Sequence, residues 1–82
     1  MNWKKIVKAE TLQSVAKDME TLFRNTDWRT FMQNELVDLD KKIDSMSKEE
    51  IENLRGLKYH LFSPQMQEYE GMVDKLLELK EE

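Results

Sequence analysis

The sequence predicts an all-α protein, a small bundle of three to four helices, and three observations support this fold class. Apolar residues recur at helical spacing in four separate stretches of the chain. Alternation of apolar and polar residues, which marks half-buried strands, is missing. The 82 residues include only two glycines and one proline, so few turns can be built.

The first predicted helix covers about residues 9–24. Six apolar residues would share one face of it, within about 120° of arc: Leu12, Val15, Ala16, Met19, Leu22 and Phe23. The sequence Asn25-Thr26-Asp27 interrupts the pattern, and either Thr26 or Asp27 can cap the helix that follows.

The second predicted helix covers about residues 28–46. Seven apolar residues fall within about 140° of arc: Trp28, Phe31, Met32, Leu36, Leu39, Ile43 and Met46. The next four residues, Ser47-Lys48-Glu49-Glu50, fit a capping box, in which Ser47 and Glu50 each satisfy a backbone N–H of the other. The capping box predicts that a new helix starts here.

The third and fourth predicted helices cover about residues 48–62 and 64–80. The third presents Ile51, Leu54, Leu57, Leu61 and Phe62, and the fourth presents Met66, Tyr69, Val73, Leu76 and Leu77. Between them, Ser63-Pro64 supplies a cap and then a proline at the first helical position. A proline disfavours helical geometry in the residue before it, so a helical hairpin is expected. The alternative is one helix over 48–80 with a kink at Ser63-Pro64.

Length and composition predict a single helical domain over residues 1–82. The chain has no Cys, which excludes disulfides and thiolate chemistry. No apolar run is long enough to span a membrane, and the start lacks the apolar core of a signal peptide. The expected location is therefore the cytoplasm.

The charge is unevenly distributed. Residues 1–8 carry Lys4, Lys5 and Lys8 and no acid, and form a basic segment that can be a separate arm. The other 74 residues hold 10 basic and 17 acidic side chains. An acidic body repels phosphate backbones, so nucleic acid is not the expected partner, and a segment of six to eight residues buries too little to hold a membrane.

No catalytic or cofactor-binding pattern is present. The single histidine, His60, lacks the partners of a nucleophilic triad or of a metal-binding motif. Gly56 and Gly71 stand alone inside helices and form no phosphate-binding loop. Asp38, Asp40 and Asp44 are interpreted as a solvated acidic face, with a cation site as the alternative. The sequence therefore predicts a protein that is not an enzyme and needs no cofactor or metal.

Apolar residues outside the main stripes are the candidate interaction site: Trp3, Ile6, Val7, Met72 and Leu79. If the first helix reached the N-terminus, the first three would lie opposite Leu12 and Met19. They would then either form a separate element that covers the core or anchor a partner. Met72 and Leu79 widen the apolar arc of the fourth helix, and such a helix is usually covered on two sides. Its second cover is either the first helix or another copy of the chain.

Residues 27–64 resemble small helical proteins of tailed bacteriophages and prophages. The resemblance rests on an aromatic-led helix at Asp27-Trp28-Arg29 and an Arg-Gly step at Leu54-Arg55-Gly56-Leu57 in a helix that ends before Pro64. This chain departs from that group by continuing past Pro64 into a further helix. The resemblance implies a helical hairpin and a phage setting but no specific activity. It implies that the expected location is the cytoplasm of a bacterial host cell, or the virion.

Three hypotheses for function follow from these patterns. The first is a non-enzymatic interaction protein of phage origin that associates with itself or with a larger phage or host protein, in virion assembly or at the capsid. The second is an acidic regulator or inhibitor that binds a host nucleic-acid enzyme or a defence protein. The third is a small DNA-packaging or DNA-binding factor that uses Lys4, Lys5 and Lys8.

Overall fold

The structure is a computed structural model that describes residues 3–24, 36 and 38–81. The predicted all-α class is confirmed, and no strand occurs in these residues. The elements are the helices α1 (Trp3–Phe23), α3 (Leu39–Lys42), α4 (Lys48–Asn53) and α5 (Ser63–Glu81), with the 3₁₀ helices η1 (Ile43–Ser45) and η2 (Leu54–His60). Much of the predicted helix 28–46 lies outside the described residues.

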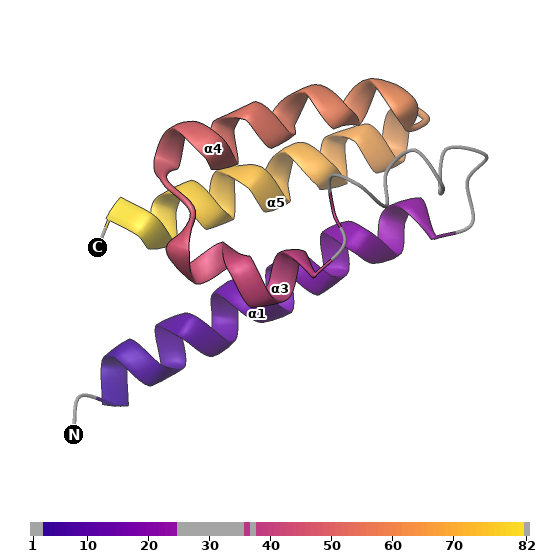
Figure 1. Ribbon diagram of the computed structural model, residues 1–82. Helices are drawn as coiled ribbons and strands as arrows, with labels where there is room; N and C mark the ends of the chain where they lie inside the picture. Colours follow the sequence, from indigo (N-terminus) through magenta and orange to yellow (C-terminus); the bar gives the residue numbers. More distant parts are fainter. Residues whose placement is uncertain (1–2, 25–35, 37, 82) are drawn as a thin grey trace.

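The bundle is elongated, with extents of 43 × 20 × 19 Å. Figure 1 shows α1 along one side, with α3 lying across it. The consecutive elements α4 and η2 run antiparallel to α5 and form a hairpin with it, and α5 also packs on α1. Both chain termini lie at the same end of the molecule, and the hairpin turn lies at the other end.

The core is formed by one face of every element. It contains Leu12, Ala16, Met19, Phe23, Leu36, Leu39, Ile43, Ile51, Leu54, Leu61, Tyr69, Val73 and Leu76, none of which is more than 6% exposed. All of these residues belong to the apolar stripes that the spacing predicts. At the centre, the rings of Phe23 and Tyr69 meet edge to face with centroids 5.4 Å apart, a favourable aromatic geometry.

The first helix begins at Trp3, six residues earlier than the apolar stripe predicts. No glycine or proline interrupts the chain before Leu12, and the lysines, Ala9 and Glu10 are good helix formers. Residues 3–8 therefore continue α1 and do not form a separate element that covers the core. The apolar pattern missed this extension because the first turns have no neighbour to pack against.

The predicted helix 28–46 is not continuous in its described part. Asp38 adopts a left-handed conformation, with φ 56° and ψ 25°, immediately before α3. A right-handed helix requires negative φ at every residue, so a single helix cannot pass through Asp38. Aspartate is one of the few non-glycine residues that enter this region readily. The break keeps Leu36 and Leu39 buried on either side of it.

The predicted helix 48–62 changes type at Leu54, from α-helical to 3₁₀. Two features disfavour the α-helix there: Gly56 lowers helix propensity, and the Leu54 carbonyl accepts a hydrogen bond from the Tyr69 hydroxyl at 2.8 Å. The prediction that Phe62 joins the core is wrong, because its side chain is 82% exposed. A 3₁₀ helix turns 120° per residue and Leu61 is extended, so a 100° wheel misplaces the residues at this end.

The helical hairpin near Ser63-Pro64 is confirmed, with a shift of one or two residues. The chain leaves the helix at Leu61 and α5 begins at Ser63, where the Met66 N–H donates to the Phe62 carbonyl at 2.8 Å. Pro64 lies in the first turn of α5, where a missing N–H leaves no bond unmade. The alternative of one kinked helix over 48–80 is wrong.

The capping box at the start of α4 is confirmed in both directions. The Glu50 N–H donates to the Ser47 hydroxyl at 3.1 Å, and the Ser47 N–H donates to the Glu50 carboxylate at 3.0 Å. The hydrogen bonds from Ser47 lower the pKa of Glu50 below its usual value.

Gly71 offers a simple test of the fold. It lies in the interior of α5, and a Cβ there would meet nothing within 4 Å. The substitution Gly71→Ala is expected to stabilise the protein by about 0.5–1 kcal/mol, because alanine restricts the unfolded chain and fits the helix without strain. Urea unfolding would measure the change. A loss of stability would mean that Gly71 is not an exposed interior position of this helix.

Candidate interaction site

The first two turns of α1 project from the bundle, and we call residues 3–8 the N-terminal overhang (Figure 1). Trp3, Ile6 and Val7 are 67%, 43% and 44% exposed, so none of the three covers the core. They face away from Leu12 and Met19, as the helical spacing requires. The expectation that these residues cover the core is wrong. The alternative, that they anchor a partner, remains a prediction.

The N-terminal overhang is also basic. Lys4, Lys5 and Lys8 are its only charged side chains. Lys4 and Lys5 are exposed and have no ionic partner within the described part of the chain. An aromatic residue, two aliphatic residues and the positive charges of Lys4 and Lys5 therefore share about two helical turns.

Met72 and Leu79, the other predicted interaction residues, are half-buried on α5 and pack against the core. The chain itself thus covers part of the surplus apolar surface of this helix. Leu79 lies in the last turns of α5, at the same end of the molecule as the N-terminal overhang, whereas Met72 lies two turns further away (Figure 1).

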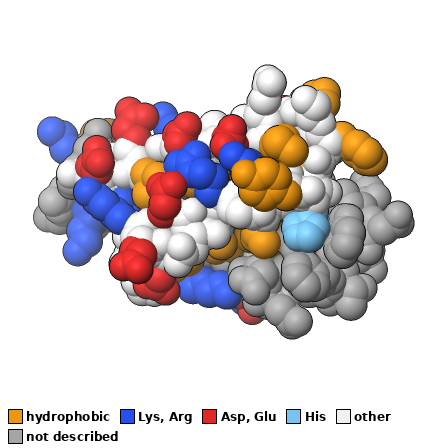
Figure 2. All heavy atoms as spheres, turned by 90° about the horizontal axis from the view of Figure 1, so that it is seen from above, with side chains coloured by type: hydrophobic (Ala, Val, Ile, Leu, Met, Phe, Trp, Pro, Cys, Tyr) orange, Lys and Arg blue, Asp and Glu red, His pale blue; other side chains and the backbone are white. Residues whose placement is uncertain are grey.

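A second exposed apolar group was missed by the sequence patterns. Tyr59 is 73% exposed and Phe62 is 82% exposed, at the turn of the hairpin. Figure 2 shows hydrophobic side chains gathered near this end, whereas acidic and basic side chains are intermixed over the rest of the face. The Lys58 ammonium lies 5.2 Å from the centroid of the Tyr59 ring, a cation–π distance. The apolar spacing reveals neither the 3₁₀ geometry of η2 nor the extended Leu61 that follows it, so it placed Phe62 on the wrong face.

The predicted acidic face is partly assembled and partly neutralised. Asp38 pairs with Lys41 at 3.7 Å, and Lys80 donates to the Asp44 backbone carbonyl at 2.6 Å. Asp38 and Asp40 both act on Glu20 of α1. Burial raises the pKa of Glu20, the negative charges of Asp40 and Asp38 raise it further, and a hydrogen bond from the Leu39 N–H opposes the shift. Acids from two elements therefore meet where α3 crosses α1.

The raised pKa of Glu20 predicts a pH-dependent effect on stability. A carboxyl whose pKa is raised on folding stabilises the native state at pH values below its unfolded pKa, and this contribution is lost as pH rises through the folded pKa. Glu20→Gln is therefore expected to raise the melting temperature at pH 7, with no difference from the original protein near pH 3. Thermal melts at both pH values would measure this. Glu10→Gln, at an exposed position of the same helix, is the matched control, and an equal gain from it would contradict the assignment.

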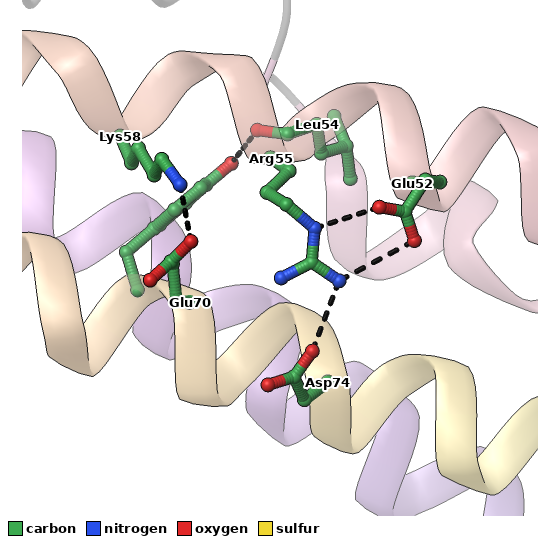
Figure 3. A network of polar contacts seen from close by, with 7 residues as sticks. Glu52, Leu54, Arg55, Lys58, Glu70 and Asp74 are labelled. Carbon is green, nitrogen blue, oxygen red and sulfur yellow. Dashed lines mark hydrogen bonds and ion pairs between the residues drawn. The ribbon is translucent and has the colours of Figure 1, made fainter.

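Polar contacts join the two arms of the hairpin (Figure 3). Arg55 binds Glu52 at 2.7 Å and Asp74 at 2.9 Å, and Lys58 binds Glu70. These contacts raise the pKa of Arg55 and Lys58 and lower that of Glu52. These side chains are engaged with one another, and the Arg55–Asp74 and Lys58–Glu70 contacts hold η2 against α5.

The spacing of these pairs explains why the two arms fit. Three residues of a 3₁₀ helix rise about 6 Å, and four residues of an α-helix also rise about 6 Å. Arg55 and Lys58 are three residues apart on η2, and their partners Asp74 and Glu70 are four residues apart on α5. The 3₁₀ geometry thus places both cations in line with both carboxylates.

No group of three side chains in residues 3–24, 36 and 38–81 is arranged to hold a metal ion. None of the helices described there has the length and apolarity needed to cross a membrane. His60 is half-buried in η2. Among the described residues, large apolar side chains are exposed on the N-terminal overhang and at the hairpin turn.

Comparison of the chain with protein-family models, with curated proteins and with solved structures finds no match.

Proposed function

We propose that the protein is a non-enzymatic interaction protein that associates with itself or docks on a larger protein. The observation that carries this proposal is the exposure of Trp3, Ile6 and Val7 on the N-terminal overhang. Solvent-exposed tryptophan next to aliphatic side chains is costly in water, and buried tryptophan is enriched among the residues that dominate binding energy at interfaces.

The more specific form of the proposal is a phage protein that acts in virion assembly or at the capsid. Its support is the resemblance of residues 27–64 to small helical phage and prophage proteins. An elongated helical bundle with apolar groups at both ends suits a component that joins larger proteins.

The experiment compares the original chain with a triple variant, Trp3→Ser, Ile6→Ser and Val7→Ser. Light scattering over a range of concentrations measures self-association, and affinity capture from phage-infected and uninfected bacterial lysates measures docking. We expect the original chain to associate in at least one assay and the variant to lose that association while keeping its helical circular dichroism signal. A strict monomer that captures no protein would overturn the proposal.

A second candidate function is an acidic regulator that binds the nucleic-acid site of a host enzyme or defence protein. It is favoured by the meeting of Glu20, Asp38 and Asp40 from two elements. A binding partner that also binds DNA should be released when Asp38, Asp40 and Asp44 are changed to lysine. Binding that survives this reversal would remove the rationale.

A further inference from the structure

One end of the molecule combines a basic apolar projection with an acidic surface. The N-terminal overhang carries three lysines and no acid. Figure 1 shows the start of α4 and the end of α5 at this same end. Residues 44–53 and 74–81, which we call the acidic end, hold seven acidic and three basic side chains. The two surfaces thus have opposite charge within one chain.

Several charges of the acidic end are already satisfied inside the molecule. Lys48 pairs with Glu81 at 3.7 Å, and Lys80 is bound to the Asp44 carbonyl. Glu49 and Glu78 are exposed and have no ionic partner among the described residues. These two carboxylates are therefore able to pair with cations from outside the chain.

The size of the N-terminal overhang limits how it can bind. A large aromatic side chain buries about 150–250 Å², so Trp3, Ile6 and Val7 together fall well short of the roughly 800 Å² that a stable interface buries on each partner. An interface that uses the overhang once would be weak. In a symmetric dimer, the overhang of each copy contacts the acidic end of the other, so the buried area and the number of charge pairs are doubled.

We propose that two copies of this chain form a two-fold symmetric dimer in which the N-terminal overhang of each copy lies on the acidic end of the other. Two-fold dimers are the commonest oligomers, and they need one surface that is complementary to itself. This end of the molecule meets that requirement because it carries both the basic overhang and the acidic end. The positive charge of Lys4 and Lys5 lies near Glu49 and Glu78 of the other copy, and Trp3 packs near the half-buried Leu79. The dimer deepens the proposed function and rests on it.

The test uses two charge-reversal variants of the full chain. One carries Lys4→Glu with Lys5→Glu, and the other carries Glu49→Lys with Glu78→Lys. Sedimentation equilibrium at about 0.05 M and 0.5 M salt measures the dimer dissociation constant. We expect each variant alone to weaken dimerisation at least tenfold at low salt, and we expect high salt to weaken the original dimer. Trp3→Ala should also weaken it at least tenfold.

Mixing the two variants tests whether the N-terminal overhang of one copy contacts the acidic end of the other. A mixture of the two variants restores both sets of charge pairs, so it should form a heterodimer close to the original in affinity. A single chain with all four changes should also dimerise again. The pair Lys17→Glu with Glu68→Lys, at exposed positions outside the two surfaces, is the control and should leave the dissociation constant unchanged. Circular dichroism of each variant checks that its helices are intact.

Three results would overturn the dimer: a monomer at every concentration, a dimer that neither reversal weakens, or reversals that weaken it without restoration in the mixture. A monomer that still captures a larger protein through Trp3 would reject the dimer and leave the proposed function standing. Loss of both self-association and capture would reject the two together.

Discussion

Replacing Tyr69 by alanine is expected to destabilise the protein by about 3–5 kcal/mol, the usual cost of removing a buried aromatic side chain. Tyr69 is fully buried, packs against the ring of Phe23 and donates its hydroxyl hydrogen to the Leu54 carbonyl. It therefore links α1, η2 and α5 at one point. Since small domains unfold with about 5–15 kcal/mol in total, this substitution removes much of the stability.

Two further variants separate the contributions of Tyr69. Tyr69→Phe keeps the ring and removes only the hydrogen bond, so a loss of about 0.5–1.5 kcal/mol is expected. Tyr59→Ala makes the same chemical change as Tyr69→Ala at an exposed position, and it should cost less than about 1 kcal/mol. Urea unfolding monitored by circular dichroism measures all three. Equal losses of unfolding free energy from Tyr59→Ala and Tyr69→Ala would contradict the placement of Tyr69 in the core.

Leu54→Ala and Leu36→Ala are each expected to cost about 2–5 kcal/mol, because each removes a buried aliphatic side chain and leaves a cavity. Leu36 is 3% exposed and Leu54 is 6% exposed, and they lie on opposite sides of the α3–η1 segment in the sequence. Leu57→Ala, at a half-buried position one 3₁₀ turn after Leu54, is the matched control and should cost clearly less. Midpoints and slopes of urea unfolding give the values. Losses under about 1 kcal/mol at both buried positions would show that the core lies elsewhere.

The apolar stripes were predictable from the sequence because burial in a helical bundle repeats every three or four residues. The capping box was predictable for a related reason: Ser47 and Glu50 satisfy each other locally, without any contact from the rest of the chain. The hairpin was predictable from Pro64, whose geometry acts on its immediate neighbours. Each of these features depends on residues that are close together in the sequence.

The features that the sequence did not predict depend on contacts between distant residues. The left-handed Asp38 sits beside α3, whose first N–H is bound by Glu20 of α1, nineteen residues earlier. The 3₁₀ helix η2 follows a carbonyl that is bound by Tyr69. Helical periodicity assumes 100° per residue everywhere, so it also put Phe62 in the core. For the candidate site, the pattern identified Trp3, Ile6 and Val7 as surplus, but only the extension of α1 shows that they project.

The match between η2 and α5 has a consequence for the alignment of the hairpin. Sliding one arm past the other by one charge pair, a shift of about 6 Å, would leave one of the two cations and one of the two carboxylates without its partner on the opposite arm. The connection at Leu61 and Phe62 is too short to absorb that shift. The hairpin is therefore held in the alignment in which Arg55 meets Asp74 and Lys58 meets Glu70.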